Sequence, residues 1–141
     1  ADVLVKSSQL KGVELSGDIV PLLIDEIPVI AVAAALADGT TTIRDAAELR
    51  VKESDRISAS VSWMKGAGID VTATDDGMVV IGGGSIRGGQ IQSYDDHRLA
   101  MSLGIAGLVS DKPITILDPD VAGISYPGFW KTVERFGGLV G

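Results

Sequence analysis

The chain has 141 residues, of which 45% are apolar and 22% charged, with a formal net charge of −7 and no cysteine. These values exclude a disordered chain, disulfides, thiolate metal sites and a Cys nucleophile, and they disfavour nucleic-acid binding, which usually needs a basic face. The lack of cysteine fits a reducing compartment, so we expect a cytoplasmic protein. The chain starts at Ala1 without a signal-peptide pattern, which favours a mature piece or a fragment.

Helices and strands are predicted to alternate along the chain. The longest apolar run, residues 29–37, is far short of the ~20 residues that span a bilayer, so no membrane partner is expected. Being apolar on all sides, it predicts a helix buried on most faces. The predicted elements are a helix over 29–37, a strand over 40–43, a helix over 53–65, a hairpin of 69–74 and 78–81, a glycine joint at 82–84, a strand over 89–93, a helix over 96–110, a strand over 113–117 and a helix over 127–136.

The second half of the chain partly repeats the first. A shift of 73 positions aligns identical residues in the first helix–strand pair with those in the third. The aligned pairs are Ala33 with Ala106, Asp38 with Asp111, Thr42 with Thr115, Ile43 with Ile116, and Asp45 with Asp118. This register predicts two copies of one β-α-β-α unit in a mixed α and β fold.

The most informative segment is LRVKESDRI, residues 49–57, at a predicted junction between strand and helix. It combines two cations with a carboxylate in Lys52, Glu53 and Arg56, and the spacing of the last two places them on one helix face. The first turn of a helix can hold an anion. An exposed, charged helix start capped by Ser54 is an equally good interpretation of the spacing alone.

Two further helix starts carry charge. Arg98 lies in the first turn of an otherwise apolar helix, where a guanidinium without a partner can bind phosphate or carboxylate. The only histidine, His97, precedes it, and taken alone it is better explained as a satisfied polar residue. Asp25 and Glu26 precede the first helix, either as an N-cap or with one of them as a general base.

Together the three charged helix starts predict an anion-binding surface. Repeated units in a sheet bring such starts to one rim, with carboxylates beside the cations. This arrangement suits a substrate that carries phosphate and carboxylate groups. With one histidine and no cysteine, no zinc motif is present, and we expect neither a metal nor a cofactor.

At this point the motifs become recognisable. Residues 49–57 and the run DHRLAM after Asp95 closely resemble the two C-terminal signatures of the 5-enolpyruvylshikimate-3-phosphate synthase family. Residues 25–28, 39–41 and 125–129 match the same family in the same order. The resemblance implies the α+β fold of the enolpyruvyl transferases, an inside-out α/β barrel of repeated βαβαββ units.

The resemblance implies that only the C-terminal part of this fold is present. Residues 1–9 would end a preceding unit, residues 10–84 would form a complete unit, and residues 85–141 would form the final one, all within one domain of the full enzyme. The missing N-terminal part is then the expected macromolecular partner. It supplies the opposing wall of the cleft, so we expect the isolated chain to be inactive.

Family members transfer the enolpyruvyl group of phosphoenolpyruvate to shikimate 3-phosphate on the route to chorismate and the aromatic amino acids. The resemblance implies that Asp25 and Glu53 are catalytic, that Asp25 and Lys52 bind shikimate 3-phosphate, and that Arg56 and Arg98 bind phosphoenolpyruvate. His97 would support Arg98.

Two positions depart from the family pattern, and two alternatives stay open. Some members carry a lysine where this chain has Ile124, and Glu48 replaces an asparagine of some members, so we assign it no role. One alternative is a fragment of the sister transferase that acts on UDP-N-acetylglucosamine. The other is a non-catalytic, excised folding or complementation module.

Overall fold

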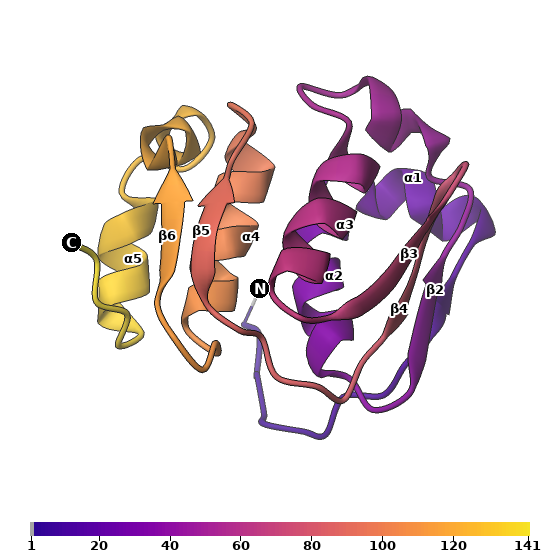
Figure 1. The fold of residues 1–141 in the computed structure, drawn as a ribbon, viewed down its shortest axis with the longest axis horizontal. Helices are drawn as coiled ribbons and strands as arrows, with labels where there is room; N and C mark the ends of the chain where they lie inside the picture. Colours follow the sequence, from indigo (N-terminus) through magenta and orange to yellow (C-terminus); the bar gives the residue numbers. More distant parts are fainter. Residues whose placement is uncertain (1) are drawn as a thin grey trace.

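The computed structural model describes residues 2–141, so the first residue of the predicted preceding unit, Ala1, lies outside the described residues. Strands and helices alternate along the described chain (Figure 1). The strands are β1 (Glu14–Leu15), β2 (Thr40–Ile43), β3 (Asp70–Thr74), β4 (Gly77–Ile81), β5 (Gly89–Gln92) and β6 (Ile114–Leu117). The helices are α1 (Val20–Leu23), α2 (Ile27–Leu36), α3 (Arg56–Gly66), α4 (His97–Gly107) and α5 (Phe129–Arg135), with 3-10 helices η1 (Gly17–Ile19), η2 (Ala47–Val51) and η3 (Pro119–Ile124).

The strands form two separate sheets. The first has the order β1-β2-β4-β3, in which β1 runs parallel to β2 and β4 runs antiparallel to both of its neighbours. The second pairs β5 with β6 in parallel. Figure 1 shows α2 and α3 beside the first sheet, α4 beside the second, and α5 beyond β6. The predicted α+β fold is therefore confirmed.

One apolar core joins the two sheet regions. It runs from Ile27 of α2 through Ile57 of α3 to Leu103 of α4, and the partly buried Ile91 of β5 packs against it. A smaller cluster seats α5 through Phe129. Among residues 2–141 no single helix is long and apolar enough to cross a membrane; only the pair Gly17–Leu23 and Ile27–Leu36, bent by 110°, meets that test jointly.

The predicted long elements exist, with shifted ends. The sequence patterns did not reveal the two-residue strand β1, helix α1 or the 3-10 helices, which are too short to show a period. The first helix is buried on most faces, as predicted, with one exposed stripe. Its inner side is buried, but Val29 and Ala33, one turn apart, are exposed. Since both are apolar, hydropathy alone could not separate the two sides.

The start of α3 differs from the prediction of a helix from residue 53. The helix begins at Arg56, and Asp55 is its N-cap, accepting a hydrogen bond from the Ser58 amide at 3.0 Å. The expected cap Ser54 instead donates its hydroxyl proton to Asp96. Glu53 therefore lies in a bend before the helix and shares no helix face with Arg56. Both serine and aspartate cap helices well, so sequence alone did not distinguish them.

The predicted β3–β4 hairpin is present, and its glycine lies in the strand and not in a left-handed turn. Gly77 has no positive φ and is the first residue of β4. A Cβ at this position would lie 2.0 Å from the carbonyl oxygen of Ile43 on β2. The glycine is needed because two backbones approach closely, and not because the turn demands φ > 0.

Replacing Gly77 by alanine is therefore expected to destabilise the chain by about 1–3 kcal/mol, the usual range for forced backbone shifts. Gly66, which ends α3 with open space around it, is the matched control. Gly66→Ala should be neutral or slightly stabilising, because alanine favours helix. Urea denaturation of both variants measures the difference, and equal stabilities would contradict this account of Gly77.

The predicted glycine joint after β4 is also more tightly built than expected. A Cβ on Gly82 would meet the carbonyl oxygens of Ala37 and Ala34, at 2.1 and 2.3 Å, and the Gly82 amide donates to Gly39. Gly82 therefore packs on the C-terminal end of α2, so the prediction of a flexible joint is wrong at this residue.

The repeat predicted from sequence has a backbone counterpart. Asp45 and Asp118, which the 73-residue shift aligns, follow β2 and β6 and have nearly the same left-handed conformation, with φ of 56° and 57°. In the first sheet β2 pairs with both β1 and β4, whereas within residues 2–141 β6 pairs only with β5. The unit boundaries at residues 9/10 and 84/85 stay a prediction.

Candidate active site

Arg56 lies at the centre of the cluster of candidate residues. It is the first residue of α3, and only 1% of its side chain is exposed. Its Nη1 donates to Asp25 at 2.8 Å, its Nη2 to Glu53 at 2.8 Å, and its Nε to Asp96 at 2.8 Å. These carboxylates come from three different parts of the chain, so one guanidinium ties together all three predicted helix starts.

Asp96 is the fully buried member of this cluster, with 0% of its side chain exposed. It is the N-cap of α4 and accepts from the amides of Arg98 and Leu99, while its other oxygen accepts from Ser54 and Arg56. Burial would raise the pKa of this carboxyl, but the hydrogen bonds and the charge of Arg56 outweigh it and hold the pKa below its ordinary value. The buried group is therefore a carboxylate at neutral pH.

Asp25 bridges the two candidate arginines. One of its oxygens lies 2.8 Å from Arg56 and the other lies 3.7 Å from Nη2 of Arg98. The hydrogen bond from Arg56 is the main reason that the pKa of Asp25 is lowered, with further contributions from the charges of Arg98 and Lys52. Glu26 occupies the N-cap position of α2, as one interpretation predicted, but within residues 2–141 neither its side chain nor that of Asp25 makes a capping hydrogen bond to the helix.

The sequence pattern suggested that Arg98 has no partner, but in the structure it contacts two acids. Its Nη1 donates to Glu26 at 3.3 Å, and its Nη2 faces Asp25. Its Nε is buried and has no hydrogen-bond partner among the described residues. The acids of the turn before α2 thus reach the arginine of α4 across the gap between the two helix starts.

Lys52 lies at the edge of the cluster. Its ammonium group forms an ion pair with Glu48 at 2.5 Å, and this contact is the main cause of the raised pKa of Lys52, with a further contribution from Asp25. His97, the first residue of α4, is half-buried and makes no side-chain hydrogen bond within residues 2–141. Its predicted support of Arg98 stays a prediction.

A separate set of hydrogen bonds, made by Arg50, holds the loop that carries Lys52 and Glu53. Arg50 donates to the carbonyl oxygens of Asp75 and Thr74 in the β3–β4 turn, at 2.7 and 2.6 Å, and its Nη1 reaches Asp55 at 2.9 Å. The hairpin turn therefore helps to fix the position of residues 50–55.

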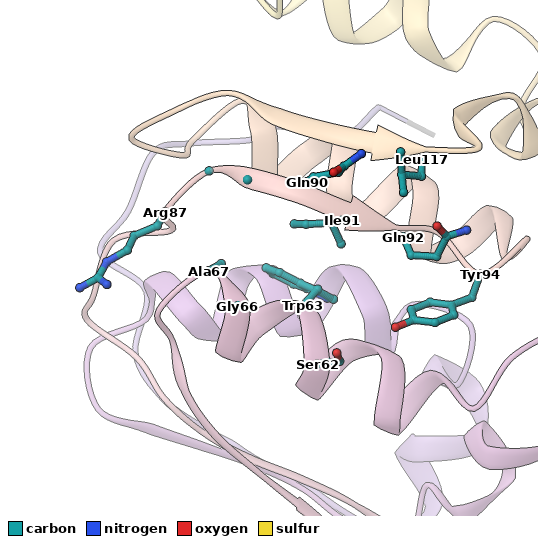
Figure 2. Close-up of a pocket in the computed structure, with 12 residues that line it drawn as sticks. Ser62, Trp63, Gly66, Ala67, Arg87, Gln90, Ile91, Gln92, Tyr94 and Leu117 are labelled. Carbon is teal, nitrogen blue, oxygen red and sulfur yellow. The ribbon is translucent and has the colours of Figure 1, made fainter.

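A hollow in the described chain lies away from this cluster. It measures about 490 Å³ and lies between α3 and β5 (Figure 2). Figure 2 shows the Trp63 ring between α3 and Ile91 of β5, and Trp63 is a buried member of the apolar core. None of the six candidate residues lines this hollow. The candidate site is an open, charged surface at the helix starts and not an enclosed pocket.

Sequence reasoning found the charged helix starts but missed Asp96. It appeared only as part of the matched motif, and a polar residue before a helix has the obvious function of an N-cap. The signal available was its place two residues before Arg98. Complete burial beside an arginine from 40 residues earlier is a tertiary feature that no local spacing reveals.

Comparison with known proteins agrees with the motifs. The family model for EPSP synthase (3-phosphoshikimate 1-carboxyvinyltransferase) matches residues 1–133. The chain is 51% identical over 135 residues to the 3-phosphoshikimate 1-carboxyvinyltransferase of Geobacter sulfurreducens, and 53% identical over 135 residues to that of Petrotoga mobilis. These matches cover 96% and 95% of this chain, but only 32% and 31% of the relatives, so the chain spans about a third of their length.

A solved structure of EPSP synthase from Acinetobacter baumannii superposes with a TM-score of 0.88 at 45% identity, covering 94% of this chain and 31% of that one. The element order, the clustered helix starts and the family match over residues 1–133 agree with one another. The chain belongs to the EPSP synthase family.

Proposed function

We propose that this chain is the C-terminal part of an enzyme that transfers the enolpyruvyl group of phosphoenolpyruvate to shikimate 3-phosphate, in the synthesis of chorismate and aromatic amino acids. The observation that carries the proposal is the meeting of Asp25, Glu53 and Arg98 around Arg56, in a chain that matches the family over residues 1–133. No observation favours the UDP-N-acetylglucosamine transferase, because the family match is to the shikimate enzyme.

In this proposal Arg56 and Arg98 bind phosphoenolpyruvate. Both guanidinium groups contact Asp25, so they lie close enough together to hold one small anion between them. A planar guanidinium matches the geometry of a carboxylate or phosphate with two parallel hydrogen bonds, which a lysine cannot offer. Lys52 and Asp25 bind shikimate 3-phosphate, whose hydroxyl is to react.

Asp25 and Glu53 are proposed to move the protons. The attacking hydroxyl loses its proton as its oxygen bonds to C2 of phosphoenolpyruvate, while C3 gains a proton and forms a methyl group. Loss of a C3 proton then restores the double bond as phosphate leaves from the tetrahedral ketal. Two carboxylates on either side of one arginine are suited to these opposite transfers. The lowered pKa of Asp25 keeps it ionised, in the form that accepts a proton.

The remaining two thirds of the enzyme are the proposed partner of this chain. Several large apolar side chains stay exposed, among them Val3, Val5, Leu22 and Phe136. An open groove of about 790 Å³ also runs between β6, α4 and the C-terminal residues. Such surfaces usually mark contacts with other protein. The proposal includes a cytoplasmic location, which the lack of cysteine fits.

A chimera tests the proposed function. The 135 residues of this chain that match the Geobacter sulfurreducens relative, at 51% identity, would replace the corresponding segment of that relative. The chimera should release phosphate only when both phosphoenolpyruvate and shikimate 3-phosphate are present. A folded chimera that turns over neither substrate would overturn the proposal.

The isolated chain is expected to release no phosphate above background under the same conditions. Orientation of two substrates and neutralisation of their charge need the opposing wall of the cleft, and effective concentration alone can contribute about 7–11 kcal/mol to catalysis. Measurable turnover by the 141-residue chain that depends on both substrates would contradict this prediction. A rescue of activity on mixing with the missing portion would instead exclude the excised, non-catalytic module.

A further inference from the structure

The cluster around Arg56 carries more negative than positive charge. Three cations, Lys52, Arg56 and Arg98, are paired with carboxylates, and the contacting acids are Asp25, Glu26, Glu48, Glu53 and Asp96. An anionic substrate that enters must therefore displace some of these acids from the arginines. Which acid leaves decides how tightly the anion binds.

Glu26 differs from the other acids at the arginines. Asp96 is buried and caps α4, while Asp25 and Glu53 contact the buried Arg56. Among the described residues, Glu26 forms an ion pair only with Arg98, at 3.3 Å, and about half of its side chain is exposed. It makes no capping hydrogen bond to α2. Its carboxylate can therefore swing into water and break no other hydrogen bond or ion pair with residues 2–141.

Arg98 itself is only partly satisfied. Its Nη1 is taken by Glu26, its Nη2 faces Asp25 at 3.7 Å, and its buried Nε has no partner among residues 2–141. A guanidinium has five N–H donors, and several of those on Arg98 point at neither Glu26 nor Asp25. A bound anion could accept from the Nη1 donor that Glu26 releases.

We propose that Glu26 is an affinity-determining residue that occupies Arg98 in place of the anionic substrate and must be displaced when phosphoenolpyruvate binds. This inference rests on the proposed function only in its choice of ligand. Glu26 takes no part in proton transfer. It lowers the affinity for the anion by keeping its carboxylate on the cation that the anion needs.

The test is an NMR titration of the full 141-residue chain with phosphoenolpyruvate alone, followed through the Nε–Hε signal of Arg98. The signal is assigned by its loss in Arg98→Lys. Glu26→Gln should tighten the apparent Kd about two- to fivefold, or about 0.4–1 kcal/mol at 1.4 kcal/mol per tenfold, as expected for a half-exposed ion pair. Glu26→Ala should act in the same direction.

Glu48→Gln is the matched control, since it removes the same charge from a carboxylate that pairs with Lys52 and not with an arginine. It should leave the Kd at Arg98 within about 1.5-fold, because exposed charges at a distance are screened by salt. Equal tightening by both variants, no tightening by Glu26→Gln, or no response of the Arg98 signal in either protein would overturn the inference. Turnover by the chimera is measured separately, so an inactive chimera with a tightened Kd would refute the proposed function and leave this inference standing.

Discussion

Asp96→Ala is expected to lower the free energy of unfolding of the chain by about 3–5 kcal/mol, the usual result of removing one partner from a buried ion pair. The substitution would leave Arg56, with 1% of its side chain exposed, without its buried counter-charge. It would also remove the N-cap of α4 and leave the Ser54 hydroxyl without its acceptor. Urea denaturation of the purified chain measures the loss.

Two further variants separate charge from capping. Asp96→Asn keeps an oxygen that can accept from the amides of Arg98 and Leu99 but loses the charge facing Arg56, so an intermediate loss of about 1.5–3 kcal/mol is expected. The adjacent Asp95 is exposed and provides a control of equal charge. Asp95→Asn should stay within about 0.5 kcal/mol of the wild type. Equal effects at the two positions would refute the buried pair.

The contribution of Asp96 to stability should depend on pH in a defined direction. Its pKa in the folded chain lies below the ordinary value of 3.8, so the unfolded chain binds protons first as the pH falls. The stabilisation is complete well above pH 3.8 and is lost as the pH falls through the lowered pKa of the folded state. The difference between wild type and Asp96→Asn should therefore shrink in acid, and a constant difference from neutral pH down to acid unfolding would contradict this.

The sequence predicted most of the long elements because their patterns are local. The apolar run of α2, the spacing of Ile57, Val61 and Met64 in α3, and the β-branched strand β2 each show their period within one element. The predicted start of α3 was wrong because two neighbouring residues, Ser54 and Asp55, are both good N-caps. The close approaches at Gly77 and Gly82 depend on carbonyl groups from other elements, which no local pattern shows.

In the candidate site, too, local features could be predicted from the sequence and contacts between distant residues could not. Charge at three helix starts is visible in the sequence, and the structure brings Asp25, Glu53, Arg56 and Arg98 together. The sequence could not show that the arginines are already paired with acids, because Glu26 and Arg98 are 72 residues apart. It also could not show that Asp96, and not a residue of its own segment, is the buried counter-charge of Arg56.

Arg56→Lys is expected to lower kcat/KM of the chimera about 10²–10³-fold. This is the usual loss when one oriented hydrogen-bond donor is removed from a reacting centre. Lysine keeps the charge, but its three N–H donors share one nitrogen and cannot reproduce the positions from which three guanidinium nitrogens reach Asp96, Asp25 and Glu53. KM for phosphoenolpyruvate should rise because one of its two proposed arginine ligands is lost. The turnover number should fall as well, because the two proposed proton-transfer carboxylates lose the group that fixes their positions.

The control for this prediction is Arg44→Lys, which makes the same chemical change at an exposed arginine whose only ion pair within residues 2–141 is with Glu14, at 3.6 Å. Steady-state kinetics should show kcat/KM unchanged within about twofold, since exposed pairs contribute at most about 1 kcal/mol. Thermal denaturation confirms that both variants are folded at the assay temperature. Because charge is conserved in both variants, a large loss confined to Arg56→Lys assigns the effect to guanidinium geometry. A folded Arg56→Lys chimera with nearly full activity would show that Arg56 holds the fold together without acting on the substrate.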